Sequence, residues 1–283
     1  MQVLSVLIFA GMFAGCETLG LVSGPTTLAN DILAGPERAA AEKQGAAVFD
    51  RTMFEKNAVV LDPAPNEYVR KITDRIVQVS HRKNSKFTVR VLNDKSVNAF
   101  SIGGEYLYVN TGLLQFFQNN QDGVAGVLGH EIAHDIAGHS ARNMTAQKWQ
   151  LLATRLVDSV TGNQVAHALA GTAGDLLLLK YSRNQEKEAD ILGTLYAGRA
   201  GYDVKAFMDF FYRMREYSSV PDKFAFMTDH PSYEDRIRTL ALVDKYLKRQ
   251  ITIGEIAAVD PKVAEDLDVA ERLDTMGRQR EIE

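Results

Sequence analysis

The chain has 283 residues, of which 46% are hydrophobic and 24% are charged, and its formal net charge is −4. This composition is ordinary for a globular protein that buries one large core or two small ones. Lysines and arginines do not gather in one stretch. The chain therefore lacks the basic stripe of a nucleic-acid-binding protein, and no nucleic-acid partner is expected.

The first residues have the pattern of an export signal followed by a lipid attachment site. Residues 3–15 form an apolar run that is too short for a membrane-spanning helix but has the length of a signal-peptide core. The run ends in two small residues before Cys16, the single cysteine. This resembles the lipobox of a bacterial lipoprotein, which implies a signal peptide over 1–15, a lipidated tether over 16–36, and a periplasmic protein anchored to a membrane, the outer one by the usual sorting pattern. The alternative is a buried or disordered N-terminal segment with an incidental cysteine.

The next part of the chain predicts two helices and then a small sheet. Residues 37–56 are rich in helix-forming residues, and apolar residues recur at helical spacing over 66–80, with a turn over 62–65 between them. One short segment alternates between apolar and polar side chains, and two more lie on either side of a Gly-Gly turn, and both patterns are typical of strands. These predicted strands are residues 86–92, 97–102 and 106–109.

The remainder of the chain predicts mainly helices. They are expected over residues 124–139, 146–180, 182–200, 203–217 and 232–249. The charged tail from Asp260 is helix-prone and is expected to be loosely docked or frayed. The patterns together predict a mainly helical α+β fold with a small mixed β-sheet, in a domain over 37–250 followed by a helical tail over 251–283.

The strongest chemical signal is an H-E-x-x-H motif formed by His130, Glu131 and His134. Residues four positions apart share one face of a helix, so the two imidazoles can bind one zinc ion. Glu131 is then placed to act as general base on the metal-bound water and to carry the proton to the leaving amine. The surrounding residues are apolar on all sides, which predicts burial, and Gly126 and Gly129 indicate close packing of another backbone.

A catalytic zinc ion needs a third protein ligand and an open position for water. His139 is one residue away from the spacing of metzincin peptidases, so it is interpreted as a helix-end residue or as a partner of a ligand. A later segment offers Glu186 and Asp190 on one helix face, and spacing alone does not choose between them. Glu188 is expected to point elsewhere into solvent.

Four blocks of residues occur in a defined order along the chain. They are Asn98-Ala99-Phe100 with Gly103-Gly104 and Tyr106 to Val109, His130 to Ser140, Ser182-Arg183 with Glu186, Ala189 and Asp190, and Asp229-His230-Pro231 with Asp235-Arg236-Ile237. Together they resemble the HtpX and CAAX-prenyl-protease group of gluzincin peptidases, in particular its soluble periplasmic, BepA-like branch. The resemblance covers about residues 37–245 and implies a zincin-type metallopeptidase domain with the H-E-x-x-H motif on its active-site helix.

The resemblance also implies a role for several single residues. Glu186 becomes the third ligand of one zinc ion per chain, and Asp190 orients a ligating histidine. His230 lies near the metal, where it either stabilises the oxyanion or occupies the open position and blocks it. Arg236 supports the His230 loop or contacts substrate.

The implied substrates are polypeptides, and the implied reaction is endopeptidase cleavage of misfolded or stalled envelope proteins, with envelope assembly machinery as a possible partner. An extended substrate would pair with an edge strand formed by Tyr106, Leu107, Tyr108 and Val109. The main alternative is a lipoprotein chaperone or assembly adaptor whose zinc site is normally blocked. A purely structural zinc site is a weaker alternative because it would not need Glu131. His81 and His167 match no block and are interpreted as surface or packing residues.

Overall fold

The computed structural model describes residues 42–140, 181–216 and 233–280, except for 44–45, 48, 52, 56–57 and 119. Cys16, His167, His230 and the helix predicted over 146–180 lie outside the described residues. The described residues between 42 and 55 are helical, as expected. The further elements are α3 (Pro63–Val77), β1 (Thr88–Leu92), β2 (Ala99–Gly103), β3 (Tyr106–Asn110), α4 (Thr111–Phe117), α5 (Gln121–Ile136), α9 (Arg183–Arg199), α10 (Lys205–Glu216), α12 (Tyr233–Leu247), α13 (Ile253–Ala257) and α14 (Pro261–Arg280).

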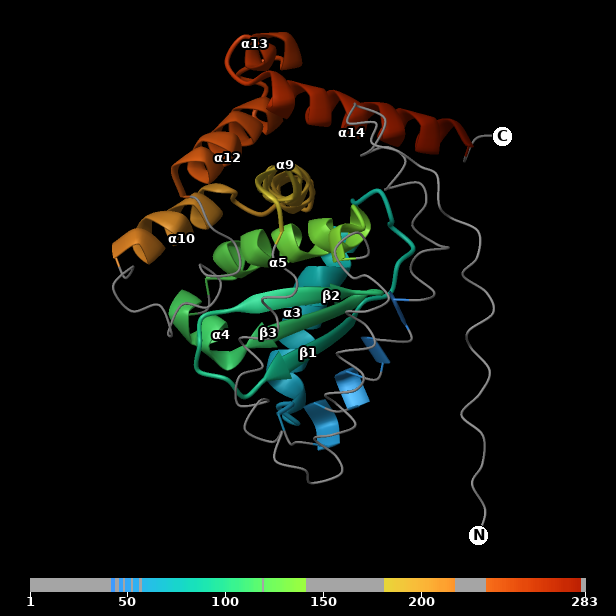
Figure 1. Cartoon of the computed structure of the whole chain (residues 1–283), viewed down its shortest axis with the longest axis vertical. Helices are drawn as coiled ribbons and strands as arrows, with labels where there is room; N and C mark the ends of the chain where they lie inside the picture. The colour runs from blue at the N-terminus through green and yellow to red at the C-terminus, as the bar shows by residue number, and fades with distance from the viewer. Residues whose placement is uncertain are drawn as a thin grey trace.

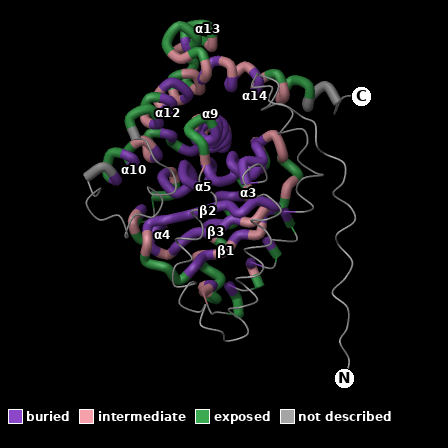
Figure 2. The backbone as a smooth tube through the Cα atoms, in the orientation of Figure 1, coloured by how far each residue is buried: buried purple, intermediate pink, exposed green. Residues whose placement is uncertain are grey.

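The architecture is a small mixed sheet with helices stacked upon it (Figure 1). The strand order is β1-β3-β2, with β1 parallel and β2 antiparallel to β3. Helix α5 packs against β2, α9 packs over α5, and both α12 and α14 pack on α9. Because α5 and α9 are enclosed on several sides, they are buried along nearly their whole length (Figure 2). The predicted mainly helical α+β fold with a small mixed sheet is confirmed.

Local capping explains where two of the helices begin. The Asp62 side chain accepts a hydrogen bond from the Ala64 amide at 2.9 Å, and Pro63 occupies the first helical position of α3. The turn predicted over 62–65 is therefore wrong, because proline is well tolerated in the first turn of a helix. Ser182 and Gln185 form a reciprocal capping box at the start of α9.

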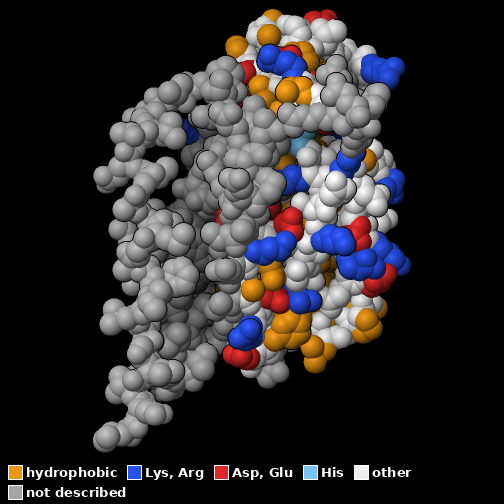
Figure 3. Space-filling model, turned by 90° about the vertical axis from the view of Figure 1, so that its right-hand side faces the viewer, with side chains coloured by type: hydrophobic (Ala, Val, Ile, Leu, Met, Phe, Trp, Pro, Cys, Tyr) orange, Lys and Arg blue, Asp and Glu red, His pale blue; other side chains and the backbone are white. Residues whose placement is uncertain are grey.

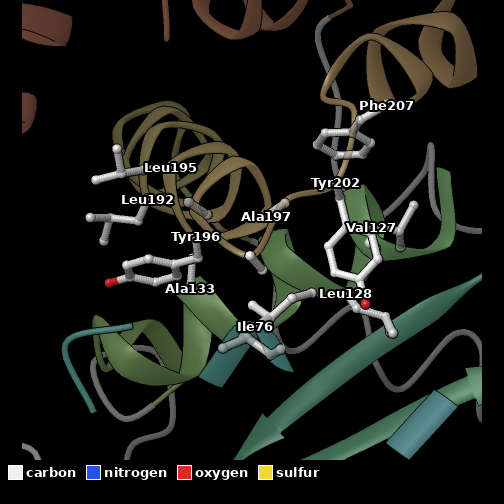
Figure 4. Close-up of a cluster of buried hydrophobic side chains, with 14 of the residues drawn as sticks. Ile76, Val127, Leu128, Ala133, Leu192, Leu195, Tyr196, Ala197, Tyr202 and Phe207 are labelled. Carbon is white, nitrogen blue, oxygen red and sulfur yellow. The ribbon is translucent and has the colours of Figure 1, made fainter. Parts of the chain in front are cut away.

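A cluster of large apolar side chains joins α9 to the layers beneath it. Tyr196 of α9 lies beside Ala133 of α5, with Leu128 of α5 and Ile76 of α3 in the layer beneath α9, and all four are fully buried (Figure 4). Full burial of a leucine or isoleucine side chain contributes about 1.5–3 kcal/mol. This packing holds α5 and α9 in a fixed relation, which matters because both carry candidate site residues.

Two glycines mark the place where α5 and α9 cross. A Cβ atom added to Gly129 would lie 2.7 Å from the Gly193 carbonyl oxygen, and one added to Gly193 would lie 2.6 Å from the His130 amide nitrogen. The close backbone predicted beside Gly129 is confirmed. At Gly126 the neighbour is instead the side chain of Phe207, at 2.4 Å from the added Cβ.

The C-terminal tail is a docked helix rather than a frayed one. Five apolar residues of α14 are buried in the core, namely Val263, Ala264, Leu267, Val269 and Ala270. Arg199 of α9 pairs with Glu271 at 2.7 Å and with Asp274, and His81 lies 3.0 Å from the Ala270 carbonyl oxygen. The tail docks because its apolar face is buried in the core, and its charged residues Glu271 and Asp274 pair with Arg199 of α9. His81 is a packing residue, as expected.

The described surface carries charges of both signs. Lysine and arginine side chains are interspersed with aspartate and glutamate on the face shown in Figure 3, in keeping with the mixed composition. Within the described part of the chain, none of the helices has the length and apolar character required to cross a membrane.

Candidate metal centre

His130 and His134 of α5 and Glu186 of α9 converge inside the protein. One ligand atom from each lies within 4.8 Å of the others, and all three residues are buried. The two histidine Nε2 atoms are 3.0 Å apart, and each is 3.5 Å from an oxygen of Glu186. Ligand atoms of a tetrahedral zinc site, each at 2.0–2.1 Å from the metal, are about 3.3 Å apart, so the spacing suits such an ion. Of the two carboxylates left open by spacing, Glu186 faces both Nε2 atoms.

Asp190 and Arg236 support His130. The Asp190 Oδ1 atom lies 2.9 Å from His130 Nδ1, which leaves Nε2 directed at Glu186. Arg236 of α12 donates two hydrogen bonds to the Asp190 carboxylate, at 2.8 and 2.6 Å, and its Nη1 lies 3.2 Å from Glu186. Burial alone would lower the pKa of His130, but hydrogen bonds to Asp190 and Glu186 raise it to about 9. Burial would likewise raise the pKa of Asp190, but Arg236 and His130 lower it.

His139 and Glu188 support His134. The Nδ1 atoms of His134 and His139 are 2.7 Å apart, and His139 Nε2 lies 3.0 Å from Glu188 Oε2. His139 is thus a partner of a candidate ligand, as expected. The expectation that Glu188 is solvated is wrong, since the residue is 6% exposed. The reason is that α9 is enclosed by α5, α12 and α14 and has no solvent face at this position. The Tyr181 ring stacks on His134 with centroids 3.8 Å apart.

Glu131 lies where α5 meets the sheet. It is buried, and its Oε2 atom accepts a hydrogen bond from the Ser101 amide of β2 at 3.1 Å. One turn later, Asp135 accepts hydrogen bonds from the Ser101 hydroxyl at 3.2 Å and from the Glu105 amide at 2.9 Å. Burial raises the pKa of Asp135 to about 6. Sequence reasoning missed Ser101 and Asp135, although Asp135 is four positions after Glu131 and therefore on its helix face.

The predicted substrate-binding edge strand is corrected by the sheet order. The strand Tyr106 to Val109 lies within β3, which is the central strand and pairs with β1 on one side and β2 on the other. Its backbone groups are occupied by those two neighbours, so it cannot receive a third strand. Among the described strands, β2 ends the sheet on the side of α5, and its Ser101 amide points to Glu131.

Three further residues with predicted roles are Arg236, His230 and Cys16. Arg236 joins the ion pairs around Asp190 and Glu186. His230 and Cys16 lie outside the described residues.

A helical domain with a small sheet, whose buried H-E-x-x-H helix faces a carboxylate from a second helix, defines a metallopeptidase of the zincin type. The profile described as "Peptidase family M48" matches residues 63–243. The chain belongs to peptidase family M48. The predicted family and the predicted class of enzyme, a metalloendopeptidase, are confirmed.

Named relatives agree with this assignment. The chain is 29% identical over 245 residues to the putative beta-barrel assembly-enhancing protease of Vibrio cholerae, which covers 77% of this chain and 50% of that protein. It is 33% identical over 190 residues to the mitochondrial metalloendopeptidase OMA1 of Schizosaccharomyces pombe, covering 65% of this chain and 55% of the relative. The beta-barrel assembly-enhancing protease of Escherichia coli K12 is 25% identical over 208 residues, covering 69% and 42%. The chain spans about half the length of these relatives.

Proposed function

We propose that the protein is a zinc-dependent endopeptidase in which His130, His134 and Glu186 hold one zinc ion per chain. The observation that carries the proposal is the convergence of three buried ligand atoms beside the carboxylate of Glu131. Two imidazoles and one carboxylate form a donor set that catalytic zinc sites use, with a fourth position left for water. When bound, zinc would polarise the scissile carbonyl and lower the pKa of that water to about 7.

Glu131 is the proposed general base. Its hydrogen bond from the Ser101 amide orients the carboxylate. Glu131 takes the proton of the attacking water and delivers it to the leaving amine. His230 is the proposed second donor to the oxyanion, or in a resting state the residue that blocks the open position.

The proposed substrate is an extended polypeptide that pairs with β2 rather than with β3. Strand β2 is the described edge next to α5, and its Ser101 amide lies 3.1 Å from Glu131. A peptide that adds to this edge by backbone hydrogen bonds would bring its own amide groups to the same carboxylate. This arrangement supports hydrolysis within a chain rather than at a free end.

The proposed setting is the cell envelope. Relatives named beta-barrel assembly-enhancing proteases support a periplasmic protein that acts on misfolded or stalled envelope proteins and works with assembly machinery. The proposed anchor is a lipid on Cys16 that holds a domain over residues 37–250 and its helical tail at the outer membrane. A Cys16→Ser variant should then leave the membrane fraction, and unchanged fractionation would contradict the anchor.

Metal content and casein cleavage of the full chain test the proposal. Wild type, Glu131→Gln and His230→Ala are compared side by side. We expect one zinc per chain in all three, and cleavage by wild type that is lost in Glu131→Gln. Faster cleavage by His230→Ala would identify His230 as the blocking residue, and slower cleavage would identify it as the oxyanion donor. Zinc without cleavage in any variant would favour the adaptor alternative, and wild type without zinc would overturn the proposal.

A further inference from the structure

A chain of polar contacts runs from His134 to the C-terminal helix. His134 Nδ1 lies 2.7 Å from His139 Nδ1, and His139 Nε2 lies 3.0 Å from Glu188 Oε2. On the far side, Lys262 of α14 places its Nζ 3.7 Å from Glu188 Oε1 and 2.7 Å from Asp266 Oδ1. The two histidines and Glu188 are buried, so water does not substitute freely for these contacts.

The contacts restrict where the imidazole protons lie. A neutral imidazole has one N–H donor and one acceptor nitrogen. The Glu188 carboxylate is an acceptor, so the His139 proton belongs on Nε2 and leaves Nδ1 as an acceptor. With both imidazoles neutral, His134 then donates from its own Nδ1, and its Nε2 keeps the lone pair. That Nε2 atom is the one that faces His130 and Glu186.

We propose that His139 and Glu188 are a positioning pair that fixes His134 in the tautomer with the proton on Nδ1, and so prepares its Nε2 as a metal ligand. The pair rests on the proposed zinc site, to which it adds residues outside the three ligands. Lys262 places a positive charge at the outer end of the pair. Through it, α14 contributes to the metal centre although it lies beyond residues 63–243 matched by the family profile.

Two substitutions at His139 separate positioning from packing. Asparagine carries an amide oxygen close to the place of Nδ1, so His139→Asn keeps the acceptor while losing ring volume. Leucine fills much of the volume, so His139→Leu keeps the packing while losing the acceptor. A purely structural residue would tolerate leucine better than asparagine, whereas a positioning residue would show the reverse order.

Zinc affinity is the first readout, measured on the full chain by competition with a chromophoric chelator. Loss of a hydrogen-bond partner of a ligand typically weakens metal binding by about 10- to 100-fold, and we expect this for His139→Leu. His139→Asn should remain within about threefold of wild type, as a retained acceptor predicts. His81→Leu is the matched control, because the His81 side chain is also only 4% exposed and contacts α14. Its zinc affinity should not change.

The tautomer of His134 is the second readout, and it needs no metal and no variant. Two-bond ¹H–¹⁵N correlation spectra of the zinc-free wild type should show His134 protonated at Nδ1, and His139→Leu should shift the population toward Nε2. Protonation at Nε2 in wild type would overturn the proposal, as would equal zinc affinities for wild type and His139→Leu. If wild type binds no zinc, the proposed function fails. If it binds zinc and the leucine variant binds equally well, the positioning pair alone fails.

Discussion

The two histidines of the candidate metal centre are supported in different ways. His130 contacts the carboxylate of Asp190, and this carboxylate accepts two hydrogen bonds from Arg236 of α12 within a buried cluster of charges. His134 is held by an imidazole, with a carboxylate only one step further out at Glu188. Helix α5 thus presents two histidine ligands whose supporting residues differ in kind, charged groups for His130 and an imidazole for His134. Substitutions among the charged residues around His130 (the ionic side) should therefore destabilise the protein by leaving a buried charge without its partner. Substitutions around His134 (the imidazole side) should instead weaken metal binding, because its tautomer is no longer fixed.

The largest expected effect is on the ionic side. Arg236→Met removes the cation that pairs with Asp190 and Glu186, both of which are buried. Breaking a buried ion pair by removing one partner costs about 3–5 kcal/mol, so the free energy of unfolding of the zinc-free chain should fall by that amount in urea titrations. Arg238→Met is the control, since Arg238 is exposed two positions away and should change stability by less than about 0.5 kcal/mol. Equal stability of the two variants would contradict the account.

A second effect concerns the contact that holds the two helices together. Gly193→Ala would place a methyl group 2.6 Å from the His130 amide nitrogen, which forces α9 away from α5. Overpacking of this kind costs about 1–3 kcal/mol. Because Glu186 moves with α9, zinc affinity should fall together with stability.

Gly254→Ala is the control for this change. The nearest atom to its added methyl group is 3.9 Å away, so there is no clash. In a helix the substitution should be neutral or stabilise by up to about 1 kcal/mol. If both alanine variants behave alike in thermal unfolding, the close approach of Gly129 and Gly193 does not set the spacing of α5 and α9.

A pH-dependent effect is expected at Asp266, which contacts Lys262 at the outer end of the His139–Glu188 pair. Burial raises the pKa of Asp266 to about 7 although Lys262 opposes the shift. The folded pKa is above the unfolded value of about 3.9, so this group favours folding at low pH, and its contribution is lost as pH rises through 7. Asp266→Asn removes the titration, so its stability relative to wild type should rise between pH 4 and pH 8, by at most about 4 kcal/mol for a shift of about three pKa units. Parallel stability curves over this range would show that Asp266 is not the titrating group.

Short-range patterns predicted much of the fold and the heart of the site. Helical spacing of apolar residues located α5, α9 and α12, and the four-residue spacing of His130 and His134 is a property of one helix turn. The position of β3 could not be predicted in this way, because strand order depends on contacts between distant segments. The burial of Glu188 was missed for a related reason. A charged residue normally marks a solvent face, but α9 is covered on several sides and pairs this charge internally.

The central claim is that His130, His134 and Glu186 hold one zinc ion at an open site. X-ray absorption spectroscopy of the zinc-loaded full chain tests it most directly. We expect nitrogen and oxygen ligands at about 2.0–2.1 Å, outer-shell scattering from two imidazoles, and an altered spectrum in Glu186→Gln. Scattering from a sulfur ligand at about 2.3 Å, or from fewer than two imidazoles, would contradict it.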